Sequence, residues 1–139
     1  MYRNIIEQLK EWKNKEGRKP LILSGARQVG KTYILKRFGE QEFANVAYIN
    51  CDDNELAKNL FMQDYNIQRI ILAIGAITEQ SIEAGKTLII LDEIQESPRG
   101  LSVLKYFCEN APQYHVAVAG SLLGITMHRG ESFPVGKVD

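Results

Sequence analysis

The chain has 139 residues, of which 45% are hydrophobic, a length and content that suit one domain with a buried core. Its 17 basic and 17 acidic side chains balance to a formal net charge of zero, so no overall basic field favours nucleic acid or an anionic membrane as an obligatory partner. The longest apolar stretch, Ile70 to Ile77, is too short to span a bilayer, and we expect no membrane partner.

The amino-terminal segment and the cysteines both indicate a soluble cytoplasmic protein. Residues 1–16 are amphipathic and highly charged, without the order of regions that defines a signal peptide. Cys51 and Cys108 are far apart and lack metal or redox spacing, as expected of two reduced thiols in the cytosol. Neither cysteine is a credible nucleophile.

The first predicted element is an amphipathic helix that begins near Asn4 and ends at Gly17. Asn4 and Glu7 have the spacing of an N-cap residue and its capping-box partner. The apolar face of this helix carries Ile5, Ile6, Leu9 and Trp12. We therefore interpret the Trp12 indole as a core anchor rather than as a surface that stacks on adenine.

A phosphate-binding loop follows the apolar run Leu21–Leu23. Its residues are Gly25, Ala26, Arg27, Gln28, Val29, Gly30, Lys31 and Thr32, a full match to the pattern G-x-x-x-x-G-K-[ST]. The two glycines let backbone N–H groups fold around phosphate oxygens, at the N-terminus of the helix that follows. Lys31 can reach the β- and γ-phosphates, and the Thr32 hydroxyl can ligate Mg²⁺. An ordinary glycine-rich turn is disfavoured, because a strand and a helix flank the loop as the motif requires.

A local cluster of basic residues is predicted to surround the phosphate site. They are Arg18, Lys19, Arg27, Lys31, Lys36 and Arg37. Attraction for a triphosphate explains much of this cluster, and the sequence gives no separate support for a patch that contacts DNA.

A helix, a strand and a second helix are predicted next. The first helix ends at Gly39, and the strand spans Val46–Ile49. The second helix has isoleucines at the spacing i, i+3, i+4 and i+7, and Gly85 and Lys86 break the pattern. These isoleucines are Ile67, Ile70, Ile71, Ile74 and Ile77.

The segment Thr87–Leu91 is a short apolar run that is followed by Asp92 and Glu93. This pattern is typical of a strand that is buried on both faces and delivers acids to its carboxyl end. We expect Asp92 to complete the Mg²⁺ shell through water, and Glu93 to polarise a water for in-line attack on the γ-phosphate. An Asp-Glu pair alone is commonly a helix cap or a solvated turn, but a phosphate loop upstream favours the catalytic interpretation.

The last predicted elements are a helix and a fourth strand. Ser97 and Pro98 have the pattern of an N-cap and first helical residue, and the helix ends near Pro112. The strand spans His115–Ala119. His115 and His128 have no partner pattern and are interpreted as structural or surface residues.

Four apolar strands that alternate with helical patterns predict a parallel α/β sheet. Polar or glycine residues follow each strand: Gly25, then Asn50 to Asp53, then Asp92 and Glu93, then Gly120 and Ser121. Because such sheets bind ligands at the carboxyl ends of their strands, one crevice can collect all four groups. The Ser121 hydroxyl could sense the attacking water or γ-phosphate, or cap a turn, and the residues leave both interpretations open.

Several alternatives remain for the nucleotide chemistry. Gln95 stands where guanine-specific switches have glycine, and no Asn-Lys-x-Asp occurs, so ATP is favoured over GTP. A small-molecule kinase needs an arginine-rich lid, and Arg129 alone is weak support for such a lid. The rival from another class is a nucleotide-gated binding module, in which ATP only orders a surface for a protein or DNA partner.

Together these motifs resemble the AAA-like prokaryotic ATPases of the archaeal-ATPase branch, over essentially the whole chain. The resemblance rests on Gly25–Thr32, Leu91–Gln95, Ala119–Leu123 and Ser132–Lys137. It implies a P-loop NTPase three-layer sandwich that binds and hydrolyses ATP, with a mainly parallel sheet of strand order 5-1-4-3-2. It also implies that Ser121 is the sensor-one residue.

The chain departs from this family in two ways. Many members have Gly-Arg where this chain has Gly136 and Lys137, and a lysine cannot fork across two oxygens as an arginine finger does. The remaining late arginines are Arg99 and Arg129. Family members also continue into a fifth strand, a lid and a second domain, often nuclease-like, and the chain ends at Asp139.

We therefore expect residues 1–139 to be an N-terminal fragment whose fifth strand is missing. In that case the strand Leu21–Ser24 lies at the edge of the sheet, where an uncovered apolar strand invites self-association. Turnover of ATP is expected to be slow without a lid, and a protein or DNA partner is expected to bind through the missing C-terminal domain.

Overall fold

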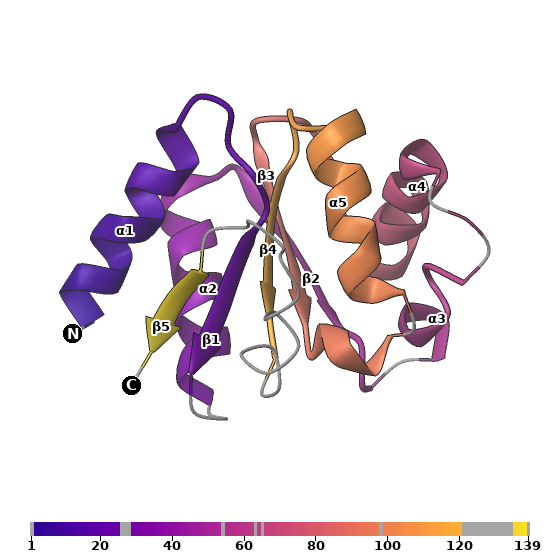
Figure 1. Ribbon diagram of the computed structural model, residues 1–139, viewed down its shortest axis with the longest axis horizontal. Helices are drawn as coiled ribbons and strands as arrows, with labels where there is room; N and C mark the ends of the chain where they lie inside the picture. The colour runs from indigo at the N-terminus through magenta and orange to yellow at the C-terminus, as the bar shows by residue number, and fades with distance from the viewer. Residues whose placement is uncertain are drawn as a thin grey trace.

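The computed structural model describes residues 2–25, 29–53, 55–62, 64, 66–97, 99–120 and 135–138. Five parallel strands form one sheet, and helices cover both of its faces (Figure 1). The strands are β1 (Leu21–Gly25), β2 (Asn45–Asn50), β3 (Thr87–Asp92), β4 (His115–Ala119) and β5 (Val135–Val138). The helices are α1 (Tyr2–Asn14), α2 (Val29–Glu42), α3 (Glu55–Lys58), α4 (Ile67–Thr78), the 3₁₀ helix η1 (Ile94–Glu96) and α5 (Gly100–Asn110).

The strand order is β2-β3-β4-β1-β5. This is the order 5-1-4-3-2 read from the other edge, so the predicted α/β P-loop fold is confirmed. The register aligns Asn50 with Asp92, Asp92 with Ala119, and Ala119 with Leu23. The carboxyl ends of the four predicted strands therefore meet at one edge of the sheet.

The expectation that the fifth strand is missing is wrong. β5 lies within the chain and pairs with β1, from Ile22 opposite Val135 to Gly25 opposite Val138. β1 is therefore an interior strand of the described sheet, which removes the stated basis for self-association through it. β5 has only four residues, Val-Gly-Lys-Val, and such a short run without clear alternation carries no strand signal until β1 supplies its hydrogen bonds.

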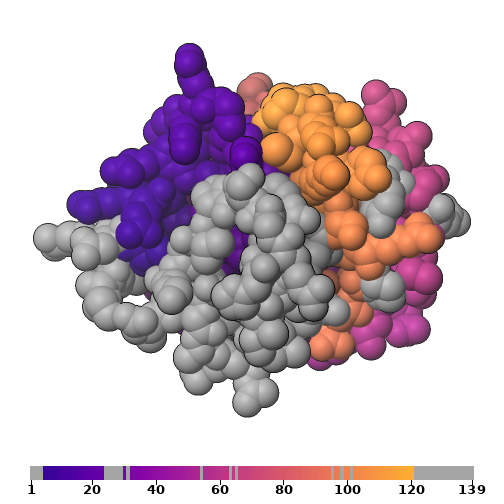
Figure 2. Space-filling model, in the orientation of Figure 1, coloured from indigo at the N-terminus to yellow at the C-terminus, as the bar shows by residue number. Residues whose placement is uncertain are grey.

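The sheet separates two apolar cores. One core packs α4 and α5 against the sheet, and the other packs α1 and α2 against the opposite face. Every residue of β3 is buried, as predicted for a strand between two helical layers. Figure 2 shows the indigo surface of α1 on the left and the orange surface of α5 on the right.

Trp12 is confirmed as a core anchor. Its side chain is 5% exposed, and its indole Nε1 donates a hydrogen bond to the Lys19 carbonyl at 2.6 Å. Gly17 follows the helix with φ of +69°, a left-handed conformation that suits glycine. α1 begins at Tyr2, so Asn4 lies inside the helix rather than at its N-cap.

The isoleucine helix is confirmed as α4, but three helix boundaries after the phosphate loop differ from prediction. α2 does not end at Gly39 and continues to Glu42. α4 ends at Thr78, before Gly85, because Glu79 adopts the left-handed conformation with φ of +57°. α5 begins at Gly100 after Arg99, so Ser97 is not its cap. Ser97 is instead buried, and its hydroxyl donates to the Lys58 carbonyl at 2.8 Å, which satisfies the end of α3.

Candidate functional site

The carboxyl edge of the sheet brings together residues from α2, β2 and β3. Asp92 is the last residue of β3 and is 6% exposed. Thr32 is the last residue of the phosphate loop and lies in the first turn of α2. The Thr32 hydroxyl donates a hydrogen bond to Asp92 Oδ2 at 2.6 Å, although the two residues are 60 positions apart. The fold therefore joins the two motifs that were predicted to share one ion.

Three donors hold the Asp92 carboxylate. Oδ2 accepts from Thr32 and also from the Tyr48 hydroxyl at 2.7 Å, and Oδ1 accepts from the backbone N–H of Glu93 at 3.0 Å. A buried carboxylate is costly unless its oxygens are hydrogen-bonded. These bonds therefore make it possible to keep an acid at the end of a fully buried strand.

The oxygen atoms of Thr32 and Asp92 suit a hard divalent cation such as Mg²⁺. A hydroxyl that donates its single proton still has lone pairs for a metal, so Thr32 can bond Asp92 and ligate an ion together. The described residues contain no group of three or more His, Cys, Asp or Glu side chains placed to hold a metal. An ion at this edge would therefore take its other ligands from water and phosphate, as Mg²⁺ commonly does.

Tyr48 belongs to this site and was missed by the sequence analysis. It lies on β2, and the Lys36 ammonium stands 3.9 Å from the centre of its ring. Burial, helped by the neighbouring Asp92 carboxylate, raises the pKa of the Tyr48 phenol above its ordinary value. The phenol therefore keeps its proton and acts as a donor. The available signal was its position in the strand predicted to adjoin the metal-binding acid.

Cys51 lies beside the site but is chemically inert. Its side chain is fully buried, and its backbone N–H donates to the Asp92 carbonyl at 2.9 Å. Burial, together with the negative charges of Asp92 and Glu93, raises the pKa of the thiol to about 12. The thiol stays protonated near neutral pH, which agrees with the expectation that it is no nucleophile.

Glu93 follows Asp92 in a left-handed backbone conformation with φ of +52°. This conformation costs a residue with a Cβ roughly 1–2 kcal/mol, and strain of this kind clusters at functional sites. Its N–H bond to Asp92 holds the turn, and η1 begins at the next residue. The turn places the second acid directly beyond the first, with its side chain partly exposed.

The loop itself is described in part. Gly25 ends β1, and the backbones of Val29, Gly30 and Lys31 lie in the first turn of α2. Apart from its chain neighbours and the backbone of its own helix, no atom of the described residues lies within 4 Å of a Cβ built on Gly30. No packing neighbour in the described chain therefore requires glycine there. The predicted site residues Ala26, Arg27, Gln28 and Ser121 lie outside the described residues, as do His128 and Arg129.

The prediction that Arg18 belongs to the basic cluster around the phosphate site is wrong. Arg18 precedes β1, and its guanidinium donates to the Pro112 carbonyl at 2.8 Å, just before β4 begins. It therefore lies at the amino end of the sheet, opposite the phosphate loop. Arg99, a predicted arginine-finger candidate, donates to the Met62 carbonyl at 3.1 Å.

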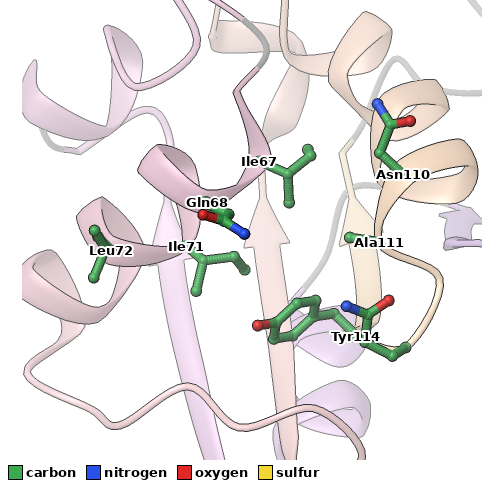
Figure 3. Close-up of a pocket in the computed structure, with 8 residues that line it drawn as sticks. Ile67, Gln68, Ile71, Leu72, Asn110, Ala111 and Tyr114 are labelled. Carbon is green, nitrogen blue, oxygen red and sulfur yellow. The ribbon is translucent and has the colours of Figure 1, made fainter.

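A separate cavity of about 330 Å³ lies between α4 and α5 (Figure 3). The Tyr114 ring points toward Ile71 of α4, and Ala111 and Tyr114 precede the first residue of β4. The cavity is therefore near the amino end of β4, and its lining includes no predicted site residue. It is distinct from the carboxyl-edge site.

None of the described helices has both the length and the apolar character required to cross a bilayer.

Comparison with known proteins shows the family. No curated protein sequence matches the chain. Among solved structures, the ORC1 protein of Aeropyrum pernix in complex with DNA is similar in fold, with a TM-score of 0.54 and 17% identity over 91% of this chain. The match covers 39% of that protein's chain. The AAA domain family matches residues 17–139. The chain therefore belongs to the AAA domain family, a family of nucleotide-binding ATPases.

Proposed function

We propose that this chain binds ATP together with Mg²⁺ at the carboxyl edge of its sheet and hydrolyses the bond to the γ-phosphate. The observation that carries the proposal is the 2.6 Å contact between the Thr32 hydroxyl and the Asp92 carboxylate. A phosphate loop and an acidic strand end can each occur by chance. Their meeting at one pair of oxygen atoms supports a shared ion site.

The triphosphate is bound by the loop Gly25–Thr32 and by the N-terminus of α2. Backbone N–H groups and the helix dipole favour negative charge there. Lys31 neutralises the β- and γ-phosphates. The open space around Gly30 agrees with a backbone that phosphate oxygens approach closely.

Thr32 would ligate Mg²⁺ directly, and Asp92 would hold it through water. The ion would supply positive charge that balances the negative charge developing during phosphoryl transfer. The division between Thr32 and Asp92 fits the structure, because the Asp92 oxygens already accept three hydrogen bonds from the protein.

Glu93 accepts a proton from the attacking water. As the water oxygen bonds to the γ-phosphorus, the bond to the bridging oxygen breaks and ADP leaves with its electron pair. Ser121 is assigned to sensing the γ-phosphate by resemblance. We expect slow turnover, because catalysis at the γ-phosphate commonly needs an arginine, and the guanidinium of Arg99 donates to a backbone carbonyl.

The second candidate is a nucleotide-gated module that binds a protein or DNA. It is supported by the fold similarity to a protein whose structure was determined with DNA. In this case ATP binds with Mg²⁺ but turns over no faster than in the Glu93→Gln variant. We favour a cytoplasmic location, which agrees with the two free cysteines.

Thr32→Val tests the proposal because valine keeps the shape and removes the hydroxyl. We expect Mg²⁺-dependent ATP binding to weaken by about tenfold or more, as found for lost metal ligands and their partners. Calorimetric titration with ATP, carried out once in the presence of Mg²⁺ and once in EDTA, measures this loss of affinity. A separate assay of phosphate release compares ATP with GTP as substrates. ATP should be preferred by a modest margin.

Thr78→Val is the matched control, since the Thr78 hydroxyl donates to the Ile74 carbonyl within α4. It should bind ATP as the parent does. If Thr32→Val binds ATP and Mg²⁺ with parental affinity, the proposed ion site is wrong.

A further inference from the structure

We propose that Tyr48 is a positioning residue that orients the Asp92 carboxylate and thereby sets the affinity of the site for Mg²⁺. The inference rests on the proposed function, and it adds a residue from β2 that neither motif contains. Tyr48 acts through Asp92 and touches neither the nucleotide nor the ion.

The hydrogen bonds around Asp92 assign different roles to Tyr48 and Thr32. Oδ2 is held by two hydroxyls from different elements, Thr32 on α2 at 2.6 Å and Tyr48 on β2 at 2.7 Å. Thr32 must also face the ion, so its geometry changes when the ion binds. The Tyr48 hydroxyl donates its single proton to Oδ2 and also lies within hydrogen-bonding reach of the Thr32 and Asn50 side chains, so it can hold Oδ2 in both states.

The ring of Tyr48 is itself held in place. Its backbone pairs with Ile90 on β3, so Tyr48 and Asp92 belong to neighbouring strands two register positions apart. The ring packs against the core beneath α2, and the Lys36 ammonium stands over it at 3.9 Å. A ring that is fixed on both sides delivers its hydroxyl to Oδ2 at little cost in conformational entropy.

Loss of this hydroxyl should loosen the carboxylate without removing it. Asp92 is itself assigned to the outer shell of the ion, and outer-shell groups typically change metal affinity by about 10- to 100-fold. Because Tyr48 acts one step behind Asp92, and Thr32 and the Glu93 N–H remain as donors, we expect the lower end of that range. The nucleotide should bind unchanged when no divalent ion is present.

Tyr48→Phe isolates the hydroxyl, since phenylalanine keeps the ring and its contact with Lys36. The probe is a fluorescent, non-hydrolysable ATP analogue, titrated with Mg²⁺ on the full chain and also measured in EDTA. We expect about tenfold weaker Mg²⁺ affinity, parental analogue affinity in EDTA, and recovery of the parental kcat at saturating Mg²⁺. Tyr114→Phe, a partly buried tyrosine before β4, is the matched control and should equal the parent.

Asp92→Asn provides the second arm. In that background Tyr48→Phe should cause no further loss of Mg²⁺ affinity, because a positioning residue has no effect once its target is altered. Parental Mg²⁺ affinity in Tyr48→Phe overturns the inference, as does weaker analogue binding in EDTA or an added loss in the Asp92→Asn background. If the parent itself shows no Mg²⁺-dependent binding, the proposed function fails first, and the two failures are thus distinguishable.

Discussion

Asp92 and His115 are buried to the same degree, each 6% exposed, at opposite ends of neighbouring strands. Asp92 ends β3 and accepts hydrogen bonds from residues of α2, β2 and its own turn. His115 begins β4, with Trp12 and Phe43 edge-on to its ring at 5.6 and 5.0 Å. Its Nε2 contacts the Lys13 carbonyl at 3.2 Å, and its Nδ1 has no hydrogen-bond partner in the described chain.

The difference shows that burial of a polar group does not by itself identify a site. Hydroxyl and amide donors from separate elements can rearrange around an arriving ion, so the Asp92 end is suited to ligand binding. At the His115 end the contacts are two aromatic rings and one carbonyl, and those from Trp12 and Lys13 hold α1 on the sheet. This agrees with the interpretation of His115 as structural.

The largest expected effect is at the carboxyl edge. Lys31→Ala should lower triphosphate affinity by about 100-fold or more, because it removes the positive charge held inside the phosphate cradle. Binding of a fluorescent ATP analogue measures the loss, and Arg37→Ala, an exposed position on the same helix, is the control. Unchanged binding in Lys31→Ala would contradict the assignment of the carboxyl edge as the ligand-binding end of the sheet.

Glu93 offers two variants that separate chemistry from strain. Glu93→Gln should keep ATP bound and reduce kcat by about 100-fold or more, as expected when a general base is lost. Glu93→Gly should lose turnover too, yet raise the free energy of unfolding by about 1 kcal/mol, because glycine relieves the left-handed φ of +52°.

Phosphate release and urea denaturation measure these two effects. If Glu93→Gln hydrolyses ATP at the parental rate, Glu93 is not the general base. The exposed carboxylates of Asp52 and Asp53 would then be the next candidates. A less stable Glu93→Gly would show that the side chain contributes more than its strain costs.

The effect expected at the amino edge depends on pH. Burial, and then the charges of Arg18 and Lys13, lower the pKa of His115 to about 4 from an ordinary value of 6.5. Between these two pH values the unfolded chain binds a proton at His115, whereas His115 in the folded chain stays neutral. The contribution of neutral His115 to the free energy of unfolding is therefore complete above pH 6.5 and is lost as pH falls toward 4.

Between pH 7 and pH 5 the free energy of unfolding should fall by about 1–2 kcal/mol through this residue. His115→Phe keeps an aromatic ring without the titrating nitrogens. The difference between parent and variant, measured by urea denaturation at both pH values, isolates the histidine from the acids that titrate nearby. An equal pH dependence in the two proteins would show that His115 is not the cause.

The sequence alone predicted the elements whose signals are local. The loop Gly25–Thr32 and the acids Asp92 and Glu93 follow apolar runs, and the isoleucines of α4 repeat with the helical period. Because parallel strands align their carboxyl ends, these local patterns also predicted the edge of the sheet at which the site lies. Their meeting within hydrogen-bonding distance is consistent with that reasoning.

Tertiary structure alone decided the contacts that depend on a distant partner. Tyr48 has the appearance of an ordinary strand residue, and its bond to Asp92 exists because β2 pairs with β3 in one register. Ser97 has the local pattern of a cap, but the Lys58 carbonyl at the end of α3 accepts its hydroxyl proton instead. β5 becomes a strand because β1 supplies its hydrogen bonds. Local periodicity determines where helices and strands form, whereas hydrogen bonds between segments far apart in sequence depend on how those elements pack.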